Sequence, residues 1–161
     1  HQSAQVRASA ARALLENDPG CLGLLAFLAA DPAATQVLRP FLAAKREPAV
    51  ENYLLNYLQA SHKESRDSQN PGILECYRTL GLCASAESLP FLSQVLLKKS
   101  WKTFMSRSPD LHRVGAALAL SLMPRTGQAE EILQKAARSA FKNVRLAYEE
   151  DVKLRPRPAE S

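Results

Sequence analysis

The chain contains little glycine and few aromatic residues. It has 6 glycines in 161 residues, and Phe, Trp and Tyr together make up 6%. It also lacks runs of Val, Ile, Thr and Tyr that would indicate β-strands. Alanine and leucine dominate instead, and both favour helices. These features argue against a glycine-rich or β-rich fold and predict an all-α protein.

Cysteine is scarce, and no apolar run reaches the length of a membrane span. The three cysteines, Cys21, Cys76 and Cys83, have no zinc-ligand spacing. Cys76 and Cys83 are seven residues apart on one helix face, too far apart to form a disulfide with each other. With no signal peptide visible at the start, the sequence predicts buried, reduced thiols and a cytoplasmic protein.

Catalytic and metal-binding motifs are missing as well. The chain has no glycine-rich phosphate loop, no G-x-S-x-G elbow and no H-E-x-x-H pair. His1, His62 and His112 are far apart, and we expect His62 in a polar loop and His112 on the surface. The acidic run 149–151 is expected to be solvated. The sequence therefore predicts no catalytic residue, no cofactor and no metal, and hence a protein that is not an enzyme.

Helical periodicity is what the sequence has in abundance. Apolar residues spaced for one helix face, with Pro, Gly and capping residues between them, predict about nine helices. Two polar stretches, 61–70 and 99–108, are predicted to be loops, and the other connections are short enough to make neighbouring helices antiparallel. The expected helices cover residues 3–15, 21–29, 32–44, 48–60, 71–83, 86–98, 109–123, 126–139 and 141–153.

Three segments repeat one pattern. Val6-Arg7, Arg113-Val114 and Val144-Arg145 each pair a branched residue with arginine ahead of small and apolar residues. Helix starts recur at about 38–40 residues, near the period of HEAT and armadillo repeats. These segments resemble the second helix of bacterial HEAT repeats. The segment 86–97 (AESLPFLSQVLL), with its internal proline, resembles the first helix.

The resemblance implies a right-handed α–α superhelix of four helix pairs, preceded by one unpaired second helix. We expect residues 1–153 to form this single domain, as part of a longer array, and residues 154–161 to form a frayed, Pro-rich tail. In such stacks the second helices line the concave surface, and the arginine beside the branched residue often holds the repeats together. That structural role is expected for Arg7, Arg113 and Arg145. A free, partner-binding surface is expected at Arg12, Arg39, Arg78 and Lys142.

The positive charge of the chain is unevenly distributed. Residues 1–97 contain 8 Lys and Arg against 9 Asp and Glu, whereas residues 98–161 contain 13 against 7. The segment 98–107 (KKSWKTFMSR) combines cations with aromatic rings, a combination that suits phosphate contact with stacking. The alternative is that its rings cover the core while the lysines face water. Its candidate binding residues are Lys98, Lys99, Trp101, Lys102, Phe104 and Arg107.

These features lead to three hypotheses about function. The first is a non-catalytic scaffold that binds an acidic protein or peptide on the concave face. The second is binding of nucleic acid through the basic C-terminal half. The third, a HEAT-like lyase or accessory subunit, rests on fold analogy alone. A bacterial origin is a further expectation from the style of the repeats, and the oligomeric state is left open.

Overall fold

The computed structural model describes residues 3–64, 69–98, 110–124 and 127–154, and all regular structure in these ranges is helical. The expected all-α class is therefore confirmed. No helix in these ranges is long and apolar enough to cross a membrane. In chain order, the elements are α1 (Ala4–Asn17), the 3₁₀ helix η1 (Pro19–Ala30), α2 (Pro32–Ala44), α3 (Pro48–Lys63), α4 (Gly72–Cys83), the short 3₁₀ turn η2 (Ala86–Ser88), α5 (Leu89–Leu97), α6 (Leu111–Leu122), α7 (Gly127–Ala137) and α8 (Lys142–Leu154).

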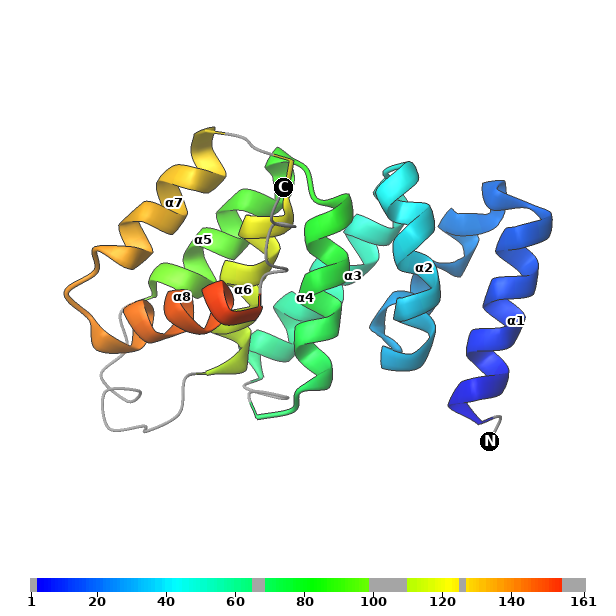
Figure 1. The fold of residues 1–161 in the computed structure, drawn as a ribbon, viewed down its shortest axis with the longest axis horizontal. Helices are drawn as coiled ribbons and strands as arrows, with labels where there is room; N and C mark the ends of the chain where they lie inside the picture. The colour runs from blue at the N-terminus through cyan, green and yellow to red at the C-terminus, as the bar shows by residue number, and fades with distance from the viewer. Residues whose placement is uncertain (1–2, 65–68, 99–109, 125–126, 155–161) are drawn as a thin grey trace, which may run out of the picture.

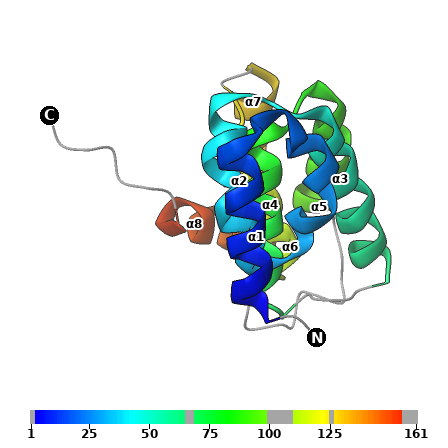
Figure 2. The ribbon, with the colours of Figure 1, turned by 90° about the vertical axis from the view of Figure 1, so that its right-hand side faces the viewer.

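Neighbouring helices lie against each other in pairs: η1 with α2, α3 with α4, α5 with α6, and α7 with α8. Between pairs, α1, α2, α4, α6 and α8 touch in succession. The molecule is elongated, with α1 at one end and α7 and α8 at the other (Figure 1). From the α1 end, α2 and α4 lie on one side and α3 and α5 on the other (Figure 2). Helix α8 differs because it runs along the long axis, whereas α1, α2 and α4 run across it (Figure 1).

Capping residues set most of the helix starts. The side chain of Asp31 accepts a hydrogen bond from the backbone N–H of Ala33 at 3.0 Å, and Ser85 accepts one from Glu87 at 3.2 Å, as expected for N-caps. Asp110 caps α6, whereas the predicted starting pair 108–109 lies outside the described residues.

Two of the expected helices differ from the prediction by a break or by more than two residues at one end. The expected helix 86–98 is divided into η2 and α5, with Pro90 in the first turn of α5, where its missing N–H costs no hydrogen bond. Helix α3 continues to Lys63, so the predicted loop 61–70 is wrong at its first residues. Ser61 is fully buried because it follows Leu54 and Leu58 on the inner face of α3.

The core is densest around α6, where every residue from His112 to Leu120 is buried. Glycine makes the contact between α4 and α6 possible. A Cβ atom on Gly115 would lie 2.2 Å from Cδ2 of Tyr77, and one on Gly81 would lie 2.8 Å from the carbonyl oxygen of Ala119. Real Cβ atoms do not approach so closely, and the two helices therefore depend on these glycines for their separation.

Helix α1 corrects one expectation about the core. Its predicted inner stripe, Val6, Ala10, Ala13 and Leu14, is exposed, whereas Ala11 and Leu15 are buried. The reason is that α1 packs against α2 and η1 through its other side.

The cysteines match the prediction of free thiols. Cys76 and Cys83 are buried and Cys21 is half-buried, and none forms a disulfide. Burial, together with the nearby charge of Glu51, raises the pKa of Cys83 to about 12. A thiol with this pKa is protonated at neutral pH and is therefore unreactive.

Candidate functional site

The three arginines of the repeated pattern hold neighbouring segments together. Arg7 Nε lies 2.5 Å from Asp31 Oδ2, which joins α1 to the start of α2. Arg113 Nη2 donates to the carbonyl oxygen of Lys98 at 2.7 Å, and Arg145 Nη1 donates to that of Ser139 at 2.5 Å. Each guanidinium thus binds the end of an adjacent helix, as the structural interpretation of these arginines predicted.

Two of the candidate binding residues meet at a single carboxylate. Arg39 on α2 pairs through Nη2 with Glu75 on α4, and Arg78 Nη1 lies 3.3 Å from Oε1 of the same Glu75. The three side chains are 20%, 32% and 23% exposed for Arg39, Arg78 and Glu75. The expectation that both arginines are free cations is therefore wrong. They form an ion cluster, the Arg39–Glu75–Arg78 cluster, that links α2 to α4.

The cluster carries an excess of positive charge in a partly desolvated place. Burial lowers the pKa of the Arg39 guanidinium, and the charge of Arg78 lowers that pKa further. Arg39 Nε is buried and has no hydrogen-bond partner among the described residues. Because one carboxylate neutralises only one of two guanidinium groups, the cluster can attract a further anion. Guanidinium groups bind carboxylates and phosphates through paired N–H donors.

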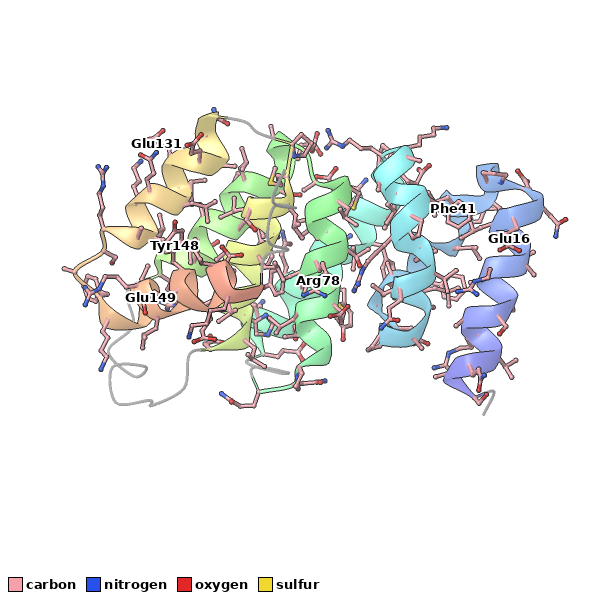
Figure 3. The ribbon with its side chains drawn as sticks, viewed as in Figure 1. Glu16, Phe41, Arg78, Glu131, Tyr148 and Glu149 are labelled. Carbon is pink, nitrogen blue, oxygen red and sulfur yellow. The ribbon has the colours of Figure 1, made fainter. Side chains whose placement is uncertain are left out.

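Figure 3 shows where this cluster lies on the molecule. Arg78 lies on α4, between Tyr148 and Glu149 of α8 on one side and Phe41 of α2 on the other. Helices α2, α4 and α8 are second helices of their pairs. The cluster therefore lies on the layer formed by these second helices, where we expected the partner-binding surface.

The other candidate cations are dispersed. Arg12 on α1, Lys98 after α5 and Lys142 at the start of α8 are exposed, as expected for a free surface. Within the described ranges, only Arg39 and Arg78 among the candidates share an ionic partner. The remaining candidates lie outside the described residues: Lys99, Trp101, Lys102, Phe104 and Arg107.

A buried polar cluster was missed by the sequence analysis. His112, predicted on the surface, is only 1% exposed. Its Nδ1 lies 3.0 Å from the hydroxyl of Tyr77, and its Nε2 lies 3.4 Å from Oγ of Ser61. These contacts join α3, α4 and α6. A serine beside an imidazole also occurs in nucleophilic catalysis, but Ser61 is fully buried, and no substrate can reach it in this structure.

His62 lies beside this cluster on the last turn of α3. Its ring meets that of His112 edge to face, with centroids 5.3 Å apart, and that of Phe91 at 6.4 Å. Burial lowers the pKa of His62, and its electrostatic interactions with His112 and Lys98 act in the same direction. The sequence contains one signal for this cluster. Ser61 continues the helical spacing of the apolar residues on the inner face of α3.

Two buried carboxylates also have structural partners. Glu51 accepts hydrogen bonds from the backbone N–H of Ser85 at 2.6 Å and from the hydroxyl of Ser88 at 2.6 Å. Asp151 is fully buried and accepts from the hydroxyl of Ser121 at 3.1 Å. The expectation that the acidic run 149–151 is solvated is therefore wrong for Asp151. No group of three or more potential ligands in the described ranges is arranged to hold a metal ion.

Comparisons with protein-family models, with curated proteins and with solved structures gave no match.

Proposed function

We propose that this chain is a non-catalytic scaffold, a short right-handed stack of HEAT-like helix pairs. Its occupant is an acidic segment of a partner protein, bound on the layer formed by the second helices. Three features support the stack: the pairwise helix contacts, the succession of second helices, and the arginines that bind neighbouring helix ends. Repeat proteins commonly bind partners along such a layer.

The single observation that supports an acidic partner is the Arg39–Glu75–Arg78 cluster. Two guanidinium groups share one carboxylate on the second-helix layer, and one buried N–H group of Arg39 has no hydrogen-bond partner in the described part of the chain. A carboxylate from a partner would bring the local charge to neutrality. Because the groups are partly desolvated, this attraction is stronger than between fully exposed charges.

The scaffold proposal is tested with an acidic probe in place of the unknown partner. We expect a fluorescein-labelled, Glu-rich peptide to bind this chain at low salt, with affinity measured by fluorescence anisotropy. Arg78→Glu should weaken binding about tenfold or more, since a charge-assisted hydrogen bond contributes about 1.5–3 kcal/mol. It should lower the melting temperature only slightly, because Arg78 is 32% exposed and an ion pair at such a place contributes little to stability.

Arg138→Glu is the matched control. Arg138 is exposed in the connection between α7 and α8, and not on α4. Reversing its charge makes the same change in net charge as Arg78→Glu. Equal losses in both variants would show that only net charge matters and would refute the assigned surface. A large drop in the melting temperature of Arg78→Glu would instead show that the cluster is structural.

Nucleic-acid binding is the alternative, and the same assay distinguishes it. Labelled duplex and single-stranded DNA should show no sub-micromolar binding if the scaffold proposal is right. Tight binding that falls steeply with salt, and that is lost when Lys98, Lys99 and Lys102 are changed to Glu, would favour the phosphate-binding hypothesis. The outcome for Arg78→Glu then shows whether the second-helix layer participates.

A further inference from the structure

The Arg39–Glu75–Arg78 cluster lies in the interior of the described chain rather than at either end. Helix α2 packs on α1, and α4 packs on α6. Figure 3 accordingly shows Arg78 near the middle of the molecule. The helices on both sides of the cluster are therefore part of this chain.

Arg78 keeps part of its guanidinium group available for a ligand. Its Nη1 lies 3.3 Å from Oε1 of Glu75, and among the described residues it makes no other hydrogen bond or ion pair. The side chain is 32% exposed. A guanidinium group has five N–H donors, and the edge formed by Nε and Nη2 can bind two oxygens of a carboxylate or a phosphate. An anion can therefore bind Arg78 without displacing Glu75.

Glu75 lies close to any anion that binds this edge of Arg78. It precedes Arg78 by about one helical turn, is 23% exposed and also contacts Nη2 of Arg39. Only one guanidinium group separates the bound anion from the Glu75 carboxylate, which places the two anions roughly 7 Å apart. That distance is inside the screening length of about 8 Å at physiological ionic strength. Because the place is partly desolvated, Glu75 repels the anion more strongly than it would in bulk water.

The charge of the cluster matches a ligand with a single negative charge. Two guanidinium groups and one carboxylate leave an excess of one positive charge. An aspartate or glutamate side chain balances this excess, whereas a phosphoserine carries about −1.5 to −2 at pH 7 and exceeds it. We propose that Glu75 is a specificity-determining residue, which makes the site select an aspartate or glutamate of the partner over a phosphorylated residue. This role of Glu75 rests on the proposed function, and it supplies the repulsive element by which an interface rejects a close competitor.

Two fluorescein-labelled acidic peptides of one sequence test this selection, with either glutamate or phosphoserine at one central position. Fluorescence anisotropy at low salt gives their dissociation constants for the 161-residue chain. Glu75→Gln keeps an oxygen that both arginines can bind but removes the negative charge. It should bind the glutamate peptide about tenfold more tightly, because a repulsive charge at this distance is lost. The phosphoserine peptide should gain at least about thirtyfold, because its larger charge loses more repulsion.

Glu16→Gln is the matched control for this change of charge. Glu16 is exposed on α1, at one end of the molecule (Figure 3), and its substitution makes the same change in net charge. It should leave the ratio of the two dissociation constants unchanged. Glu75→Asp keeps the negative charge and should keep the ratio as well. An unchanged ratio in Glu75→Gln would overturn the proposal, as would an equal change in Glu16→Gln.

Thermal unfolding distinguishes a failure of this role of Glu75 from a failure of the scaffold proposal. In Glu75→Gln, two neighbouring guanidinium groups lose their shared carboxylate, and a bound phosphate should stabilise them. We expect inorganic phosphate, compared with acetate at the same ionic strength, to raise the melting temperature of Glu75→Gln more than that of the wild-type chain.

This phosphate response decides the role of Glu75 if the wild-type chain binds neither peptide. The scaffold proposal would then fail, whereas a phosphate response in Glu75→Gln would still support the exclusion of phosphate by Glu75, and its absence would overturn it. Circular dichroism shows whether Glu75→Gln is folded. A variant that does not fold would assign Glu75 a structural role only and would also overturn the proposal.

Discussion

Helices α1 and α6 begin with the same pairing of valine and arginine and have similar alanine and leucine content, yet their environments differ. Helix α6 is surrounded by α4, α5, α7 and α8, and every residue from His112 to Leu120 is buried. Within the described residues, α1 packs substantially only on α2 and η1, and its buried residues are Ala11 and Leu15. Position along the molecule, rather than the local sequence pattern, therefore decides which helix sides are covered.

The arginines of these two helices, in contrast, make similar contacts. Arg7 in α1 and Arg113 in α6 each bind an oxygen at the end of an adjacent element, Asp31 Oδ2 and the Lys98 carbonyl respectively. A link of this kind needs one neighbour only. It therefore forms at the α1 end of the molecule as well as at α6, whereas burial of a whole helix requires neighbours on every side.

The largest expected effect contrasts one leucine from each helix. Leu118→Ala in α6 should lower the free energy of unfolding by about 2–5 kcal/mol, because a fully buried side chain is replaced by a cavity. Leu14→Ala in α1, where the leucine is 52% exposed, should change it by less than about 0.5 kcal/mol. Urea titration followed by circular dichroism measures both. Similar losses in the two variants would contradict the exposure of Leu14 in this structure.

Local chemistry explains why the sequence predicted the helix ends and the structural arginines well. Asp31 and Ser85 cap helices through bonds to residues two positions along the chain, and such short-range bonds can be inferred from sequence. The stripe of α1 was predicted on the wrong side, because its apolar residues occupy more than one side and periodicity does not say which one is covered.

The candidate site depends on contacts between distant segments, and the sequence predicted it only in part. Arg39 and Arg78 were identified as candidates, but the pairing of both with Glu75 requires α2 and α4 to lie side by side. His112 was misplaced for a similar reason. Its polar partners, Tyr77 and Ser61, come from two other helices, and no spacing within α6 reveals them.

A glycine comparison tests the crowding around α6 with a smaller change. Gly115→Ala should destabilise the protein by about 1–3 kcal/mol, since the new Cβ would lie 2.2 Å from Cδ2 of Tyr77 and the ring must move. Gly127→Ala in α7 is the matched control, because nothing lies within 4 Å of its added Cβ. The control should be neutral or stabilising by up to about 1 kcal/mol. A neutral result for Gly115→Ala in thermal unfolding would contradict the close approach of α4 and α6.

The smallest expected effect is a pH dependence at His62, which lies where α3 meets α6. Burial, then electrostatic interactions with His112, Lys98 and Arg113, lower the pKa of His62 below 6.5, while Asp110 opposes them. The folded state therefore favours the neutral ring. The stability it contributes is complete above pH 6.5 and is lost as the pH falls from there through the lowered pKa.

We expect His62→Gln to reduce the slope of unfolding free energy against pH in this acidic range, and Lys63→Gln, at the exposed neighbouring position, to leave it unchanged. Urea titrations above and below pH 6.5 measure both slopes. Since His62 is only partly buried, the change should be smaller than the loss in Gly115→Ala. An unchanged slope in His62→Gln would show that groups other than His62 cause the acid sensitivity. The place where α3 meets α6 would then tolerate a charged His62 ring.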